Sequence, residues 1–167
     1  MNNFKKSLCF SGHRTDKLPK KENIIMKLKE NIYIETKKYI LYGINTFYFG
    51  GCYGFDIMCA EIVIELKKIY NNIKLIGVIP FKGQENLWEE EDKLKYKNII
   101  SLCDEVIILN NNYKKGCYYE RNRYIVDKSN YLICYCRPSS KGGTKYTINY
   151  AIEKGIEIKN LYKKGRY

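Results

Sequence analysis

Short apolar runs separated by longer segments of helical period constrain the fold of this chain more than any other sequence feature. The runs predict strands over residues 7–11, 46–50, 75–81, 105–110, 131–136 and 157–162. The segments between them predict helices over residues 22–42, 56–70, 87–103, 118–129 and 144–154. This regular alternation of strand and helix is typical of an α/β domain.

Two of the expected strands, residues 75–79 and 106–109, are apolar at almost every position. Strands of this kind are buried on both faces, as in parallel sheets that carry helices on both sides. The chain has 167 residues, which suits one domain with its own core. We therefore expect residues 1–167 to form a single Rossmann-like three-layer sandwich with a mostly parallel sheet.

The formal net charge of +12 raises the question of a nucleic-acid partner. The basic residues are 25 Lys and only 5 Arg, and they are scattered in pairs from Lys5-Lys6 to Lys163-Lys164. The chain is also rich in Asn, Ile and Tyr, the residues with AT-rich codons, so coding bias accounts for much of the lysine. Nucleic-acid binders usually gather their charge on one face and use Arg for bidentate contacts. We therefore expect no nucleic-acid partner, although the summed positive field still attracts small anions.

Seven cysteines form no Cys-x-x-Cys pair and are odd in number. This pattern disfavours both a disulfide framework and a zinc site, so we expect no metal and a reducing, cytoplasmic location. No apolar run approaches the roughly 18 residues of a membrane span, and the start of the chain has no secretory signal pattern. We therefore expect no membrane partner.

Glycines and polar residues follow several of the expected strands, where doubly wound sheets bind their ligands. Residues 50–56 and 142–144 each lead from a strand into a helix, where free amides and the helix dipole favour a phosphate. The alternative is a tight turn in which Asp56 or Thr144 caps the helix. The candidate ligand-binding residues in the loops after the expected strands are Gly12, His13, Arg14, Gly50, Gly51, Tyr53, Gly54, Phe55, Asp56, Pro80, Phe81, Gln84, Gly142, Gly143 and Thr144.

Further candidates lie next to these loops. Arg14 can bind a phosphate, and so can Arg121 with Asn122 at the start of an expected helix. The alternative is that this helix only presents a basic face to solvent. The single histidine, His13, is either part of the anion site or a hydrogen-bonded turn residue. Trp88, like Tyr53, Phe55 and Phe81 of the loops, offers a ring against which a base can stack, or else belongs to the core.

Five motifs occur in one order: Ser-Gly-His-Arg at 11–14, Gly-Gly-x-x-Gly-Phe-Asp at 50–56, Ile-Pro-Phe-x-Gly-Gln at 79–84 followed by Trp88, Arg-Asn-x-x-x-Val-Asp at 121–127, and Gly-Gly-Thr at 142–144. Together they resemble the YpsA-like branch of the SLOG superfamily, from about Cys9 to Ile158. The resemblance implies a Rossmann-like fold that binds or senses a nucleotide-derived ligand such as ADP-ribose or an NAD derivative. It also implies a homodimer.

The same superfamily includes the LOG phosphoribohydrolases and the DNA-processing protein DprA. In the hydrolases a Glu-Arg pair on a helix and a glutamate after a Gly-Gly-x-Gly-Thr turn carry the catalysis. This chain keeps the pair as Glu120 and Arg121, the two catalytic candidates, but has Lys145-Tyr146-Thr147 where the glutamate is expected. The resemblance therefore favours binding, with hydrolysis of a nucleotide N-glycosidic bond as the alternative and nucleic-acid binding of the DprA type as a third class.

Overall fold

The computed structural model describes residues 6–164 and contains the expected order of strands and helices. The strands are β1 (Ser7–Gly12), β2 (Thr46–Phe49), β3 (Lys74–Ile79), β4 (Glu105–Ile108), β5 (Tyr131–Tyr135) and β6 (Glu157–Asn160). The helices are α1 (Glu22–Leu41), α2 (Phe55–Lys67), α3 (Glu90–Leu102), α4 (Cys117–Asp127) and α5 (Gly143–Glu153). A short 3-10 turn covers Thr15–Lys17.

The strands form one sheet in the order β4-β3-β2-β1-β5-β6, and every pair of neighbours in it is parallel. From β1 the chain winds outward through β2 and β3 to β4, and then returns to place β5 and β6 on the other side of β1. The strand order therefore reverses between β1 and β5. The expected Rossmann-like sandwich is confirmed, with a sheet that is wholly parallel among residues 6–164.

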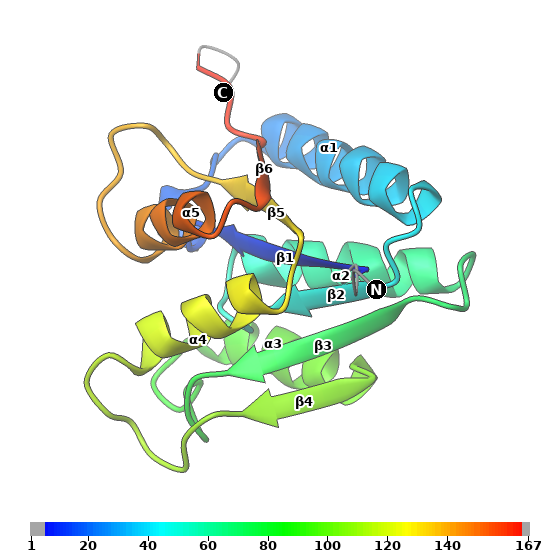
Figure 1. The fold of residues 1–167 in the computed structure, drawn as a ribbon. Coiled ribbons are helices and arrows are strands. Elements are labelled where there is room, and N and C mark those ends of the chain that lie inside the picture. The colour runs from blue at the N-terminus through cyan, green and yellow to red at the C-terminus, as the bar shows by residue number, and fades with distance from the viewer. Residues whose placement is uncertain (1–5, 165–167) are drawn as a thin grey trace.

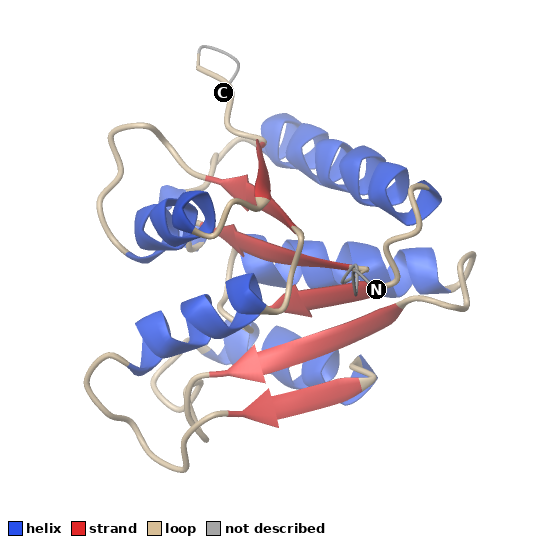
Figure 2. Ribbon diagram, viewed as in Figure 1, coloured by secondary structure: helices blue, strands red, loops and turns tan. Residues whose placement is uncertain are grey.

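Helices cover both faces of the sheet (Figures 1 and 2), with α2 and α3 behind the strands and α4 in front of them. The larger core lies between the sheet and α1–α3 and includes Phe10 and Phe47. The smaller core lies beneath α4 and α5 and includes Cys9 and Leu132. Successive side chains of a strand point to opposite faces, so β1 contributes Phe10 to one core and Cys9 to the other.

The prediction that residues 106–109 are buried on both faces is wrong. They begin in β4, which lies at the edge of the sheet and leaves Val106 and Ile108 exposed. Composition cannot identify an edge strand, because an apolar run has the same composition in the centre of a sheet and at its edge.

Helix α3 begins at Glu90 rather than at residue 87 as predicted. The amide of Trp88 donates to the carbonyl of Glu85 at 2.9 Å, and the amide of Asn86 donates to that of Gly83 at 3.1 Å. These turns keep residues 83–88 out of the helix. Trp88 therefore sits in the loop after β3, close to the carboxyl edge of the sheet.

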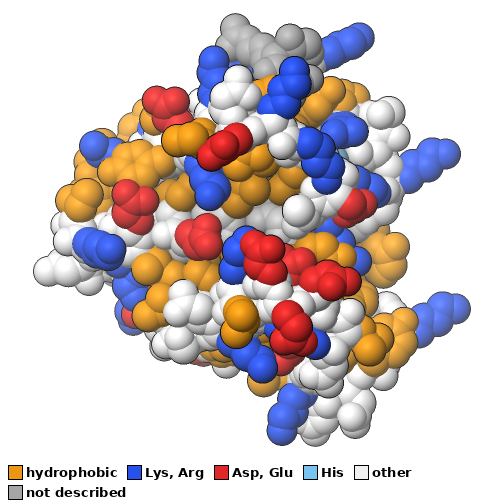
Figure 3. All heavy atoms as spheres, turned by 180° about the vertical axis from the view of Figure 1, so that it is seen from behind, with side chains coloured by type: hydrophobic (Ala, Val, Ile, Leu, Met, Phe, Trp, Pro, Cys, Tyr) orange, Lys and Arg blue, Asp and Glu red, His pale blue; other side chains and the backbone are white. Residues whose placement is uncertain are grey.

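Seen from behind (Figure 3), basic side chains are spread over the surface and interspersed with acidic ones. The seven cysteines are free. Within residues 6–164, no three His, Cys, Asp or Glu side chains come together in a way that could hold a metal ion. Nor does that part of the chain contain a helix long and apolar enough to cross a membrane.

Candidate functional site

A cavity of about 490 Å³ opens beyond the carboxyl ends of β1, β2 and β5, beside the point where the strand order reverses. This is the place where doubly wound sheets bind ligands, and the volume lies within the roughly 300–1,000 Å³ of small-molecule clefts. The lining residues are Phe10, Ser11, Gly12, His13, Arg14, Asp16, Lys17, Cys52, Tyr53, Asp56, Tyr118, Tyr119, Arg121, Asn122, Ile125, Ser140, Lys141, Gly142, Gly143, Thr144 and Lys145. The segments after β1, β2 and β5 and the start of α4 therefore meet in one cavity.

The start of α5 offers open amides to this cavity. Gly142 is the N-cap residue, with φ of 120°, and no side chain caps the helix, so the capping role considered for Thr144 is not seen. No atom lies within 4 Å of the position that a Cβ on Gly142 would take. Because the first N–H groups of a helix have no partner within it, this end of α5 is available to an anion.

The start of α2 is more fully occupied by the protein itself. Gly54 is its N-cap residue and Asp56 does not cap the helix. The amide of Phe55 donates to the carbonyl of His13 at 3.1 Å, and the amides of Gly50 and Cys52 act on the carboxyl of Asp56, whose pKa they lower. This loop therefore has fewer free amides for a phosphate than its glycines predict.

Arg121 is 6% exposed and forms part of the cavity wall. Its Nη1 donates to the carbonyl of Gly50, and its Nε donates to Oδ1 of Asn122 at 2.8 Å. Among residues 6–164, no carboxylate lies within 4.0 Å of its guanidinium. A Cβ on Gly50 would lie 2.5 Å from Nη1, so the glycine is what allows this close approach.

Arg14 also lines the cavity and is exposed. Its guanidinium carbon is 5.3 Å from the centre of the Tyr53 ring and 5.9 Å from that of Tyr118. Such cation–π contacts orient the guanidinium without using its N–H groups fully. Arg14 can therefore still bind an anion in the cavity.

Asp56 is 6% exposed and also lines the cavity. Burial raises the pKa of its carboxyl to about 6, against the lowering effects of the Arg121 charge and of the amides of Cys52 and Gly50. Its Oδ1 has no hydrogen-bond partner within the described part of the chain.

His13 holds the loop after β5. Its Nε2 accepts the amide N–H of Arg137 at 3.0 Å, and Ser140 Oγ lies 3.1 Å from the same nitrogen. A backbone N–H only donates, so Nε2 carries no proton and the neutral ring is protonated on Nδ1. Burial, with the charges of Lys17 and Arg137, lowers the pKa of His13. The structure thus supports the turn-residue interpretation rather than a cationic partner for an anion.

Aromatic rings surround the cavity, but not all of those expected. Tyr53, Tyr118 and Tyr119 line it, whereas Trp88 packs edge-on behind Tyr53 with the ring centres 5.1 Å apart. Phe55 is fully buried in the larger core.

Several candidates stand outside the cavity wall. They are Gly50, Gly51, Gly54, Phe55, Pro80, Phe81, Gln84, Trp88 and Glu120. Gln84 supports the neighbouring loop, since its Nε2 donates to the carbonyl of Gly51 at 3.3 Å. Glu120, the carboxylate considered for catalysis, pairs instead with Lys114 at 3.1 Å.

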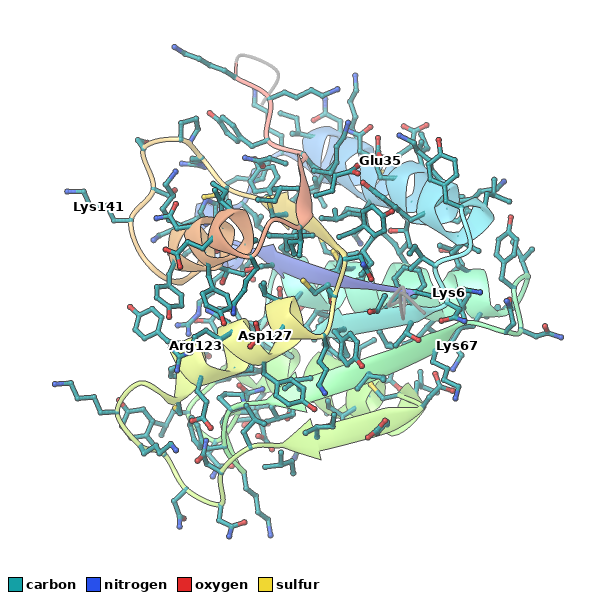
Figure 4. All side chains as sticks on the ribbon, viewed as in Figure 1. Lys6, Glu35, Lys67, Arg123, Asp127 and Lys141 are labelled. Atoms are coloured by element: carbon teal, nitrogen blue, oxygen red, sulfur yellow. The ribbon has the colours of Figure 1, made fainter. Side chains whose placement is uncertain are left out.

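Some lining residues were not predicted from the sequence. Lys141 and Lys145 flank the Gly-Gly-Thr turn, and that position was the available signal for them. Tyr118 lies three residues before Arg121, on the same side of α4, a spacing that also could have identified it. Lys141 lies at the same end of the sheet as Arg123, whereas Lys6 and Lys67 lie at the opposite end (Figure 4).

The sheet is all-parallel and doubly wound, and a cavity lined by cations lies where its strand order reverses. These features define a Rossmann-like domain with a cleft of the kind that binds small molecules. The family profile YpsA, described as the YspA SLOG family, matches residues 8–163. The chain belongs to this family, as the five ordered motifs predicted.

Curated relatives are UPF0398 proteins of bacilli. The chain is 31% identical over 111 residues to one from Bacillus pumilus, covering 65% of this chain and 60% of the relative. It is 24% identical over 151 residues to one from Bacillus velezensis, covering 87% of this chain and 83% of the relative.

Solved structures of DprA share the fold. The Streptococcus pneumoniae protein has a TM-score of 0.58 at 18% identity, covering 91% of this chain and 48% of that one. The Helicobacter pylori protein, described with its binding mode for single-stranded DNA, has a TM-score of 0.65 at 15% identity, covering 96% and 66%. This chain thus spans about half to two thirds of the DprA chains, and at these identities the likeness concerns the fold.

Proposed function

We propose that this domain binds or senses a nucleotide-derived ligand that carries phosphate, such as ADP-ribose or an NAD derivative. The observation that carries the proposal is the buried guanidinium of Arg121 in the cavity wall, with no carboxylate within 4.0 Å among residues 6–164. A buried charge is costly unless it is paired. A phosphate in the cavity supplies that pairing.

The surroundings of Arg121 support an anion. Among the described lining residues, five side chains are cationic and two are carboxylates; the cations are Arg14, Lys17, Arg121, Lys141 and Lys145. The uncapped start of α5 adds free amides and the positive end of its dipole. Tyr53, Tyr118 and Tyr119 supply apolar faces for a base or sugar. The homodimer and the cytoplasmic location implied on sequence grounds remain proposals beside this one.

The test is titration calorimetry with ADP-ribose on the wild-type protein and on Arg14→Gln. Arg14 is exposed, so its loss leaves the fold intact, while removal of a charge-assisted contact to phosphate weakens binding by about 10- to 100-fold. Lys29→Gln on the exposed face of α1 is the control with the same change of charge.

The control variant is expected to bind as the wild type does. Equal weakening in both variants would mean a non-specific effect of net charge. Absence of binding to ADP-ribose, NAD and nucleoside monophosphates alike would overturn the proposal. Chromatography of the recovered ligand distinguishes binding from hydrolysis of an N-glycosidic bond, for which the position of Glu120, outside the cavity wall, gives no support.

Single-stranded DNA is a second candidate ligand, and one feature of the surface favours it. The exposed ring of Tyr119, the half-buried rings of Tyr53 and Tyr118 and several lysines line the same cavity. Proteins use this combination to stack bases and follow a phosphate backbone. The DprA fold neighbours, one of which is described as binding single-stranded DNA, point the same way. The expectation that nucleic acid is not a partner therefore finds no support here.

A further inference from the structure

The Asp56 carboxylate is an unusual group to find in a cavity suited to anions. It comes from the first turn of α2, is 6% exposed, and lines the same space as the cationic side chains. Its Oδ1 accepts no hydrogen bond from residues 6–164. Buried polar atoms without a partner are rare in folded proteins and costly, so an atom of this kind beside a cavity indicates a ligand group that completes it.

The chemistry of Asp56 restricts what that group is. An ionised carboxylate only accepts hydrogen bonds, so its partner must donate one. A phosphate is excluded as the partner because two anions repel each other. A cationic donor is disfavoured because the charges of Arg121 and Arg14 act on the same carboxylate. A neutral donor remains, and in nucleotides the neutral donors are the hydroxyl groups of the sugar and the N–H groups of the base. The ribose hydroxyls are the donors that every ribonucleotide carries, whatever its base.

The protein around Asp56 does not fill this role itself. The amides of Gly50 and Cys52 lower the pKa of the carboxyl, yet Oδ1 stays without a hydrogen-bond partner among residues 6–164. Arg121 is the charge with the largest effect on the pKa of Asp56. Its Nη1 and Nε nevertheless donate to Gly50 and Asn122. Both the carboxylate and the guanidinium therefore belong to the cavity wall, where the carboxylate lacks a donor for Oδ1 and the guanidinium lacks an anion within 4.0 Å among residues 6–164.

We propose that Asp56 accepts hydrogen bonds from the ribose hydroxyls of the ligand, so that the cavity binds ribonucleotides in preference to their deoxy counterparts. The inference rests on the proposed function and deepens it. The ligand is held at two chemically different ends. Arg14, Arg121 and the start of α5 bind phosphate, and Asp56 distinguishes the sugar.

The experiment measures the affinity of the wild-type protein for AMP, 2′-deoxy-AMP and 3′-deoxy-AMP by titration calorimetry. Loss of a hydroxyl bonded to a charged acceptor is expected to weaken binding by about 10- to 100-fold for at least one deoxy ligand. This comparison needs no mutation, so it does not depend on the folding of any variant.

Two variants then test whether Asp56 is the residue that distinguishes ribose from deoxyribose. Asp56→Asn has the same shape but no charge, and it is expected to lower the ratio of ribose to deoxyribose affinity by about 5- to 10-fold, because a neutral hydrogen bond is weaker than a charged one. Arg14→Gln is the matched control: it is expected to weaken all three ligands alike and to leave their ratio unchanged.

The outcomes separate this inference from the proposed function. If AMP and both deoxy ligands bind the wild-type protein equally, the phosphate site stands and the role of Asp56 is overturned. If the wild type discriminates but Asp56→Asn does so to the same extent, another residue reads the sugar and the assignment is wrong. If none of the three ligands binds at millimolar concentration, both proposals fail.

Discussion

The side chains in the cavity wall have one of two roles: some stabilise the fold, and others are available to bind a ligand. His13 belongs to the first kind, because its Nε2 accepts the amide of Arg137 and fixes the loop that leads to the start of α5. Arg14 belongs to the second, since it is exposed and its guanidinium contacts the rings of Tyr53 and Tyr118. Adjacent residues in the sequence thus have different roles, which their common position after a strand does not reveal.

His13 is predicted to titrate below the ordinary 6.5 of histidine. Burial and the charges of Lys17 and Arg137 lower the pKa of the ring, and protonation of Nε2 would also remove the acceptor of the Arg137 amide. Because the folded pKa is lowered, the contribution of His13 to stability is complete above about pH 6.5 and is lost as the pH falls through the folded pKa. The chain has a single histidine, so proton NMR follows one imidazole signal without assignment.

A His13 pKa at or above 6.5 would contradict this account. His13→Gln provides a further check, because a glutamine carbonyl can still accept the Arg137 amide. It is expected to keep the loop in place and to remove this part of the dependence of stability on pH.

Helices α2 and α5 begin in the same way but in different surroundings. Each has a glycine N-cap residue with positive φ and no side-chain cap. A Cβ on Gly54 would lie 2.7 Å from the amide nitrogen of Thr15 and 2.8 Å from the carbonyl oxygen of His13, whereas the same atom on Gly142 would meet nothing within 4 Å. The start of α2 is thus packed against the loop after β1, and the start of α5 is open.

Alanine substitutions at these two positions are predicted to differ in cost. Both force a side chain onto a backbone with positive φ and strongly negative ψ, a conformation that is nearly restricted to glycine and costs about 1–3 kcal/mol. Gly54→Ala also presses a methyl group against backbone that cannot move independently, so its total is expected to exceed about 3 kcal/mol, while Gly142→Ala stays within the conformational cost. Urea denaturation of both variants measures the difference, and equal losses would refute the packing argument.

The distribution of charge over the whole molecule determines where and how strongly it binds a polyanion. The +12 is spread over the surface, but Lys17, Lys141 and Lys145 come together at the cavity, where tyrosines also lie. A single strand of DNA that follows this rim would release counterions as each lysine pairs with a phosphate.

If the domain binds single-stranded DNA there, its affinity is predicted to fall steeply between about 50 and 200 mM salt. Lys141→Gln is then expected to reduce the slope of log affinity against log salt by about 0.7, and Lys29→Gln on α1 to change it less. Fluorescence anisotropy with a labelled oligonucleotide measures both. No complex at about 50 mM salt would remove DNA as a ligand.

The fold followed from the sequence because its evidence is local. Apolar runs such as 75–79 and the helical period between them are properties of neighbouring residues, and parallel strands with right-handed crossovers then leave few arrangements. The same logic placed the loops after β1, β2 and β5 at one edge, where they do surround a cavity.

What local pattern could not supply was the partner of each polar group. The free Oδ1 of Asp56, the neutral state of His13 and the exposure of β4 depend on segments that are distant in the sequence and meet only after folding. The sequence by itself therefore determined the architecture and the edge of the sheet that bears the site. The tertiary structure alone decided which amides and charges remain available there, because burial and hydrogen bonding are properties of the packed molecule.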